Sequence, residues 1–431
     1  MSDPYLPGHG DRSFSVTHYE LDLGYRPQGN RLTGQATLSC TARADLNHVV
    51  LDLAGNLDVA KVSVAAAPAR HTHRGNRLRV QTGPRHAGEE FTVVVKYGGA
   101  PRPINAPGHG LAGWEELTDG VIVAGQPHGA PSWFPCNDRL DDKATYALEL
   151  SAPADYHVSF SGTQRSCERS GASRRWRFEQ SAPMASYLAT VQIGRYRAQP
   201  QPGPVPLILA APEGAADPAF EATFGDTGRM LDFFSDRFGP YPFESYTTVV
   251  TEDPLDIPLE SQSLSTFGSN FATGDWEAVR LVAHELAHSW FGNAVTCAAW
   301  RHIWLHEGFA CYAEWLWSQE AGLKSTAERA AHHHARLRAL PQDLVLSDPG
   351  AEMMFDDRVY KRGALTLHAL RMRVGDEVFF DILRSWVRAH TAGSVTTEDF
   401  VAHASRVSGQ PLADFFRPWL EQRALPPLPA P

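Results

Sequence analysis

Two histidines and a glutamate near the middle of the chain have the types and spacing of a hydrolytic metal site. Residues 282–292 read VAHELAHSWFG and contain the pattern HExxH. On a helix, residues four positions apart lie on one face about a turn apart, so His284 and His288 can direct both imidazoles at one metal ion. Glu285 would lie on the same side of the cavity, where its carboxylate can reach a water beside the metal without binding the metal. That placement suits a general base.

The third ligand is predicted at Glu307, which opens the next helical segment. A catalytic zinc ion uses three protein ligands and leaves a fourth position for water. Eighteen residues separate His288 from Glu307, which fits a helix, a loop and an antiparallel helix. HExxH alone can occur by chance, but an added glutamate at a fixed spacing makes an incidental surface helix a poor explanation. We predict one zinc ion per chain, bound by His284, His288 and Glu307.

The size and charge of the chain limit the kinds of partner it can have. The chain has 431 residues and a mass of 47.4 kDa, which predicts two or three domains rather than a single core. Its formal net charge is -10, whereas a nucleic acid or an anionic membrane would favour a basic surface. No stretch approaches the roughly 18 apolar residues of a membrane span. We therefore expect neither nucleic acid nor membrane as a partner.

The cysteines and the first residues predict where the protein works. The five cysteines are odd in number and lack CxxC or CxxH spacing, so a disulfide framework is not expected. Residues 1–15 are polar, with no apolar segment of signal-peptide length and no basic leader. A reducing compartment fits these features, and we predict a cytoplasmic enzyme. The oligomeric state stays open.

The hydrophobic pattern changes near the middle of the chain. From residue 14 to about 197, short alternating runs are broken by glycine and proline, which predicts a β-rich domain built as a sandwich or a large curved antiparallel sheet. Residues 198–206 hold four prolines in nine positions and cannot form a helix or a central strand. We place the boundary there, which gives domains 1–198 and 199–431. After a short strand at 207–210, helical periodicity predicts helices over residues 220–238, 276–291, 307–319, 327–340, 360–374, 377–389 and 398–407.

Two distant segments resemble those of a known enzyme family. Residues 284–316 read HELAHSWFGNAVTCAAWRHIWLHEGFACYAEWL, and residues 126–146 read QPHGAPSWFPCNDRLDDKATY. Both closely resemble segments of the aminopeptidase N-like gluzincin zinc aminopeptidases, in the same order. The resemblance implies an α+β multidomain fold, with an N-terminal antiparallel β-rich domain, saddle-like or sandwich-like, before a mainly helical, thermolysin-like zinc catalytic domain. Relatives usually continue with a small β-sandwich and a large helical domain, so a two-domain short form is expected here.

The resemblance also implies a role for Tyr360. The family has a catalytic tyrosine separated by one residue from a Lys-Gly pair, and here Tyr360 holds that position while Arg362 replaces the lysine. The hydroxyl of Tyr360 would donate a hydrogen bond to the oxyanion as the scissile carbonyl becomes tetrahedral. The alternative is a structural role, in which Tyr360 packs in the core and its hydroxyl group forms a hydrogen bond within the protein.

Two further residues match positions that bind the substrate's amino group in the family. Glu260 stands at the glutamate of a Gly-x-Met-Glu-Asn motif, although Ile257, Leu259 and Ser261 replace its neighbours. An acidic side chain in a closed cleft can pair with an α-ammonium and so distinguish chain ends from chain interiors. Gln126 matches the position from which the first domain contributes to the same pocket.

These features predict a zinc-dependent aminopeptidase that hydrolyses the first peptide bond of peptides with a free N-terminus. Two alternatives remain open from the sequence. One is a thermolysin-like endopeptidase, because the zinc residues are shared and only the amine-binding residues separate the two activities. The other is a metal-bearing interaction module without catalysis, against which the presence of Glu285 and Tyr360 argues.

Overall fold

The computed structural model describes residues 3–215 and 217–429. The first two residues of the expected domain 1–198, which also begin the polar segment 1–15, and the last two residues of the expected domain 199–431 lie outside the described part. The chain forms two compact units. The first unit takes the chain up to Pro200 together with Leu207–Ala215 and Glu244–Ser269, and the second takes the remainder. The expected α+β class is confirmed, whereas the boundary between residues 198 and 199 stays a prediction.

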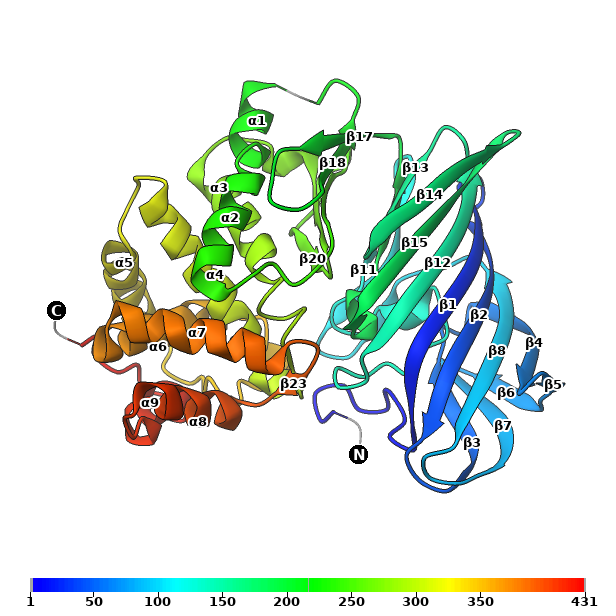
Figure 1. The fold of residues 1–431 in the computed structure, drawn as a ribbon, viewed down its shortest axis with the longest axis horizontal. Helices are drawn as coiled ribbons and strands as arrows, with labels where there is room; N and C mark the ends of the chain where they lie inside the picture. Colours follow the sequence, from blue (N-terminus) through cyan, green and yellow to red (C-terminus); the bar gives the residue numbers. More distant parts are fainter. Residues whose placement is uncertain (1–2, 216, 430–431) are drawn as a thin grey trace. The chain divides into compact units, whose positions relative to one another are not determined.

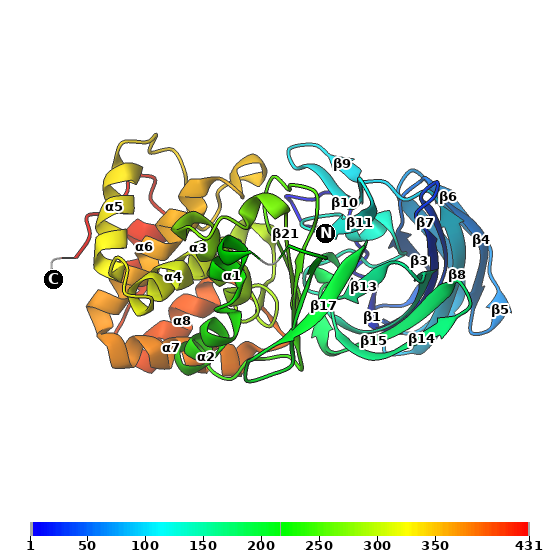
Figure 2. The same ribbon diagram turned by 90° about the horizontal axis from the view of Figure 1, so that it is seen from above.

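The largest element of the first unit is an eight-stranded sheet in the order β14-β15-β12-β1-β2-β8-β4-β5. Its long strands lie side by side, and the sheet curves along its length (Figures 1 and 2). Burial alternates along β12 as expected for a sheet with one face on the core. β1 and β12 pair in parallel, because the long intervening chain lets the second strand return in the same direction. The strands are β14 (Thr163–Ser170), β15 (Ser173–Met184), β12 (Ala144–Pro153), β1 (Phe14–Arg26), β2 (Arg31–Ala42), β8 (Glu90–Gly99), β4 (Leu57–Val64) and β5 (Ala67–Pro68).

Two smaller antiparallel sheets complete the β-rich part of this unit. One has the order β13-β16-β11-β10-β9 and the other the order β3-β7-β6. The core beside the large sheet is aromatic: Tyr19 stacks on Tyr146 with ring centroids 4.8 Å apart, and Phe134 packs edge-on against Trp133 at 4.5 Å. The strands are β13 (His157–Phe160), β16 (Val191–Gly194), β11 (Gly120–Ala124), β10 (Gly110–Leu117), β9 (Ile104–Ala106), β3 (Leu46–Asp52), β7 (Arg77–Arg85) and β6 (His71–Arg74).

A mixed sheet in the order β17-β18-β19-β21-β20 was not anticipated from the sequence. β18 pairs with β19, and β19 with β21, in parallel, while β20 runs antiparallel to β21 at the edge. The proline-rich stretch begins as the edge strand β17, where prolines are tolerated because one side of the strand needs no ladder bonds. The strands are β17 (Tyr196–Gln201), β18 (Leu207–Pro212), β19 (Tyr246–Val250), β20 (Leu259–Ser261) and β21 (Leu264–Phe267).

The second unit is mainly helical, as expected (Figure 1). The first expected helix is split at Gly225 and Asp226, and the last helix, α9, was missed. Thr396 caps α8 in a reciprocal capping box with Asp399. Among the described residues, no helix combines the length and apolar character that a membrane crossing requires. The helices are α1 (Pro218–Phe224), α2 (Thr227–Phe238), α3 (Trp276–Ala287), α4 (Trp304–Glu320), α5 (Thr326–Arg338), α6 (Asp357–Val374), α7 (Asp376–His390), α8 (Thr397–Ser408) and α9 (Ala413–Leu420), and the strands β22 (Thr296–Cys297) and β23 (Ser394–Val395) pair in parallel.

Helices α4 and α6 touch backbone to backbone at two glycines. A Cβ built on Gly308 would lie 2.7 Å from the Cα atom of Gly363, and a Cβ on Gly363 would lie 2.6 Å from the Cα atom of Gly308. Neither glycine has a positive φ, so the close approach alone requires their lack of a side chain. Gly308 follows Glu307, and Gly363 lies one helical turn after Tyr360. The contact therefore fixes the spacing of the two helices that carry those candidate site residues.

We expect Gly363→Ala to destabilise the protein by about 1–3 kcal/mol, because the new methyl group must displace the backbone of α4. Helix propensity alone predicts the opposite sign, since alanine is favoured over glycine by roughly 1 kcal/mol inside a helix. Chemical denaturation of the wild type and the variant measures the difference. An unchanged or increased free energy of unfolding would show that the helices do not need this close contact.

Candidate metal centre

The two histidines of the HExxH pattern lie at the end of α3. Asp275 caps the start of this helix by accepting a hydrogen bond from the backbone N–H of Ala278 at 3.0 Å. His284 lies in the last turn and His288 is the C-terminal cap. Their ring centroids are 4.8 Å apart with the planes at 77°. The helix thus directs both imidazoles to one side, as the spacing predicted.

The carboxylate of Glu307 lies against both imidazoles. Its Oε2 atom is 3.4 Å from Nε2 of His284 and 3.5 Å from Nε2 of His288. One ligand atom from each residue lies within 4.8 Å of the others, and all three side chains are buried. The structure therefore brings together the three residues that the sequence assigned to the metal.

The opposite ring nitrogens of the histidines are held by hydrogen bonds. Nδ1 of His288 lies 3.0 Å from the carbonyl oxygen of Phe291, and Nδ1 of His284 lies 2.8 Å from Oε1 of Glu314. An acceptor at Nδ1 fixes the proton there and leaves the Nε2 lone pair for a metal. Two imidazole nitrogens and one carboxylate are the donor set of many catalytic zinc sites. The residues present therefore fit zinc.

Burial and neighbouring charges shift the pKa values of the two carboxylates of the centre, Glu285 and Glu307, in opposite directions. Burial raises the pKa of Glu285 above its ordinary value, against the opposing influence of His284 and His288. Burial would also raise the pKa of Glu307, but His288 and His284 outweigh it and hold that pKa well below its usual range. Glu307 is thus kept ionised as a ligand must be, while Glu285 has the greater proton affinity of the two, which suits a group that accepts and returns a proton.

Glu314 is a functional candidate that our reading of the sequence missed. Besides its contact with His284, the Oε2 atom of Glu314 lies 3.3 Å from Nη1 of Arg280 and 3.9 Å from Nζ of Lys361. The side chains of Glu314, His284 and Lys361 are buried, and that of Arg280 is partly buried. Burial raises its pKa, but Lys361, His284 and Arg280 together lower it to about 2. Glu314 lies seven residues after Glu307, which places it on the same face of α4 two turns on. That spacing was the available signal.

Tyr360 lies on α6 with its ring stacked near that of His284. The centroids are 5.9 Å apart and the planes are at 22°. The tyrosine is half-buried rather than enclosed in the core. The structure therefore brings Tyr360 to the histidines, which is the arrangement expected of a residue that acts on the same reacting group.

Arg362, the departure from the family's pattern, points to a different partner. Its buried guanidinium donates to the carbonyl oxygens of Trp419 at 2.9 Å, Leu344 at 3.3 Å and Arg423 at 2.8 Å. It also donates to carbonyls at and after the end of α9. An arginine offers five N–H donors in a fork, whereas a lysine offers three at one point. The exchange therefore serves the end of the helical unit rather than the metal.

The turn after α3 depends on Gly292. This residue has φ +126°, and a Cβ there would lie 3.2 Å from Nδ1 of His288. Further along the same loop, the backbone N–H of Cys297 donates to Nε2 of His306 at 2.7 Å. The loop between the two helices that carry the candidate ligands is therefore held near its start by the conformation of Gly292 and further on by the hydrogen bond to His306.

Gln126 and Glu260 belong to the first unit, and they contact each other. The Nε2 atom of Gln126, just after β11, donates to Oε1 of Glu260 on the edge strand β20 at 2.5 Å. Both side chains are half-buried. Residues 134 positions apart in the chain are thus joined, as expected if both serve one binding site. The amide orients the carboxylate and leaves acceptor capacity on it for a cation.

Comparisons with known proteins agree with this geometry. A family model described as the peptidase family M1 domain matches residues 222–419, and one described as the peptidase M1 N-terminal domain matches residues 15–188. The chain is also similar to the crystal structure of an M1 zinc metallopeptidase from Deinococcus radiodurans, with 33% sequence identity, a TM-score of 0.90 and full coverage of both chains. A mutant of that metallopeptidase bound to a Tyr-Ser-Ala substrate is similar at 32% identity, with a TM-score of 0.91 and the same coverage.

The curated relatives are longer. Aminopeptidase M1-C from Oryza sativa subsp. japonica is 27% identical over 329 residues, which cover 68% of this chain and 36% of that protein. The chain therefore spans a little over a third of the length of this relative. Leukotriene A-4 hydrolase from Xenopus laevis is 25% identical over 434 residues, covering 93% of this chain and 69% of that protein.

We expect Glu314→Gln to weaken zinc binding about 10-fold to 100-fold, because the neutral amide no longer supports the basicity of His284 and leaves Arg280 and Lys361 without their buried counter-charge. Competition with a chromogenic chelator measures the dissociation constant. Glu320→Gln, at the exposed end of the same helix, is the matched control and should bind zinc as the wild type does. Equal affinities in all three proteins would remove Glu314 from the metal centre.

Proposed function

The chain belongs to peptidase family M1, whose similar structures are zinc metallopeptidases, and on that premise we propose that it is a zinc-dependent aminopeptidase acting on peptides with a free N-terminus. The observation that carries the proposal is the buried set of His284, His288 and Glu307, whose ligand atoms converge on one point. Two imidazole Nε2 atoms and a carboxylate oxygen that converge in the interior, with both Nδ1 atoms held by acceptors, are the arrangement that a zinc ion requires.

The proposed mechanism divides the work among five side chains. The two histidines and Glu307 would hold the zinc ion, which when bound would supply a Lewis acid to polarise the scissile carbonyl and to lower the pKa of water. The carboxylate of Glu285 accepts a proton from the attacking water and later delivers it to the leaving amine. The hydroxyl of Tyr360 donates to the oxygen that gains negative charge, a contribution worth roughly 3–4 kcal/mol in comparable oxyanion holes. Its position beside His284 supports this role.

The preference for a free N-terminus is proposed to come from Glu260 and Gln126. An α-ammonium needs a carboxylate acceptor, and Glu260 is ionisable, half-buried and oriented by the amide of Gln126. A blocked or internal residue offers no positive charge to this carboxylate. The Tyr-Ser-Ala substrate in a similar structure supports a short peptide as the substrate here.

We also propose that the enzyme works in a reducing compartment such as the cytoplasm. All five cysteines lie in the described part of the chain, none of them forms a disulfide there, and four of them are buried. Burial raises the pKa of Cys40, Cys136 and Cys311, which keeps these thiols protonated and unreactive. Cell fractionation that finds the protein in an oxidising compartment would contradict this location.

We expect Glu285→Gln to retain zinc and to lower kcat by about 100-fold or more, because glutamine keeps the shape of the side chain but cannot accept the proton. Metal analysis and an aminoacyl p-nitroanilide assay, with and without a chelator, measure the two effects. Glu277→Gln, an exposed position near the start of the same helix, is the control. A zinc-replete Glu285→Gln enzyme with wild-type turnover would exclude the mechanism.

We expect Glu260→Ala to raise KM for free-amine substrates about 10-fold or more with a smaller change in kcat, since the lost contact is to the substrate's ammonium. Gln126→Ala should shift KM in the same direction by a smaller factor. Peptides with free and N-acetylated termini are compared in each variant by following release of the first residue. Equal cleavage of both peptides by the wild type would instead indicate a thermolysin-like endopeptidase.

A further inference from the structure

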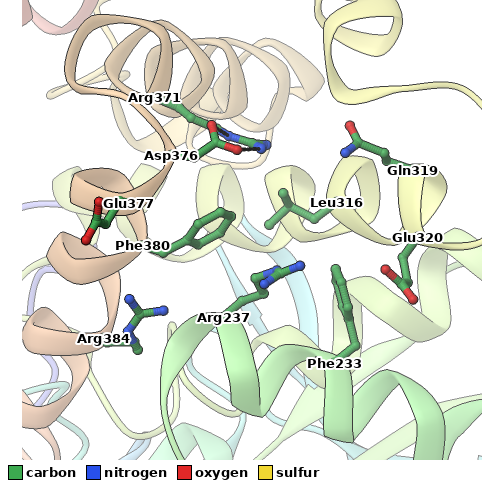
Figure 3. Close-up of a pocket in the computed structure, with 10 residues that line it drawn as sticks. All are labelled: Phe233, Arg237, Leu316, Gln319, Glu320, Arg371, Asp376, Glu377, Phe380 and Arg384. Atoms are coloured by element: carbon green, nitrogen blue, oxygen red, sulfur yellow. Dashed lines mark hydrogen bonds and ion pairs between the residues drawn. The ribbon is translucent and has the colours of Figure 1, made fainter.

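A pocket of about 450 Å³ opens on the helical unit away from the residues of the metal centre. It is lined by side chains from α2, α4, α6 and α7, and Figure 3 shows these ten residues around Arg237. Its volume is in the range of small-molecule sites. The lining is partly apolar, from Phe233, Leu316 and Phe380, and partly charged, from three arginines and three acids.

Two of the three arginines are already paired. Arg371 makes a two-pronged contact with Asp376, at 2.8 Å from Nε and 2.7 Å from Nη2. Arg384 donates to Oδ1 of Asp381 at 2.5 Å and to the carbonyl oxygen of Asp236 at 3.3 Å. These guanidiniums have their counter-charges within the protein and need none from a ligand.

Arg237 is different, because within the described part of the chain its guanidinium has no carboxylate or carbonyl partner. It is instead held between two aromatic rings, with its central carbon 5.1 Å from the ring centroid of Phe233 and 5.2 Å from that of Phe380. Figure 3 shows Arg237 between these two side chains in the middle of the pocket. A guanidinium stacked on aromatic rings keeps its N–H donors free in its own plane, where they fit a carboxylate.

The remaining charges limit the ligand to a single negative group. Once Arg384 and the pair of Arg371 with Asp376 are set aside, the lining holds Arg237 and two acids, Glu377 and Glu320. Glu320 lies 3.8 Å from Arg229. A phosphate or a polyanion would meet these carboxylates as like charges, which is unfavourable. A monocarboxylate is tolerated, and Leu316, Phe233 and Phe380 offer an apolar wall for its body.

We propose that this pocket binds a carboxylate carried on an apolar body, with Arg237 as the group that recognises the carboxylate. A free apolar amino acid and the C-terminus of a short peptide share this chemistry. Its lining includes none of the residues proposed to bind the substrate's amine, and its ligand needs no free amino group.

Isothermal titration of the zinc-loaded protein with N-acetyl-phenylalanine tests the proposal, because this probe has the carboxylate and the apolar body but no ammonium. We expect the wild type to bind the probe, and we expect the dissociation constant to be at least tenfold larger for Arg237→Met. Methionine keeps an aliphatic side chain between the two rings but has no guanidinium N–H donors. N-acetyl-phenylalanine amide, without the carboxylate, should not bind at this site. N-acetyl-alanyl-phenylalanine binding more tightly than N-acetyl-phenylalanine would identify a peptide C-terminus as the ligand, and the reverse order would identify a single amino acid.

Arg388→Met is the matched control, since Arg388 is an exposed arginine in the last turn of α7 and does not line the pocket. It should bind the probe as the wild type does. Arg237→Lys, which keeps the charge without the fork, should also lose affinity and serves as a second variant if Arg237→Met does not fold. Equal binding by wild type and both Arg237 variants, or no binding by the wild type, would overturn the proposal.

Discussion

The burial of three glutamates in the helical unit is the constraint on which the rest of this unit depends. Glu285, Glu307 and Glu314 expose 5% or less of their surface. An ionised carboxylate in the interior is costly unless it is paired with positive charge or a metal. Glu307 lies between two imidazoles, and Glu314 has Arg280 and Lys361 close to it. The third, Glu285, has its pKa raised by burial, so the structure keeps one carboxylate ready to take up a proton.

Lys361 on α6 can lie close to Glu314 on α4 because these two helices approach more closely than larger side chains at their crossing would allow. The contact of Gly308 with Gly363 joins α4, which carries two of the buried glutamates, to α6, which carries Tyr360 and Lys361. Larger residues at this crossing would separate the helices and move Lys361 away from Glu314. The glycines therefore matter to the site through electrostatics as well as through packing.

The sequence predicted those parts of the site that depend on local geometry. The spacing of His284 and His288 is a property of one helix turn, and the capping of α8 by Thr396 is a property of a few residues, so both could be inferred without the fold. The contact between Gln126 and Glu260 joins residues from distant elements, and only the family resemblance suggested that they act together. The parallel pairing of β18, β19 and β21 was missed because these strands are short and their pattern does not indicate which strands become neighbours.

Two adjacent basic residues after Tyr360, Lys361 and Arg362, take part in two separate networks. Neighbouring residues on a helix point about 100° apart, so Lys361 and Arg362 cannot face the same partner. Lys361 faces α4, with Nζ 3.3 Å from Sγ of Cys311 and 3.9 Å from Glu314. Arg362 faces the end of α9 and binds its carbonyl oxygens, groups that have no partner within that helix. The helix that carries Tyr360 is thereby held on two sides. The buried cation beside Glu314 is Lys361, which precedes position 362, where the family has its lysine.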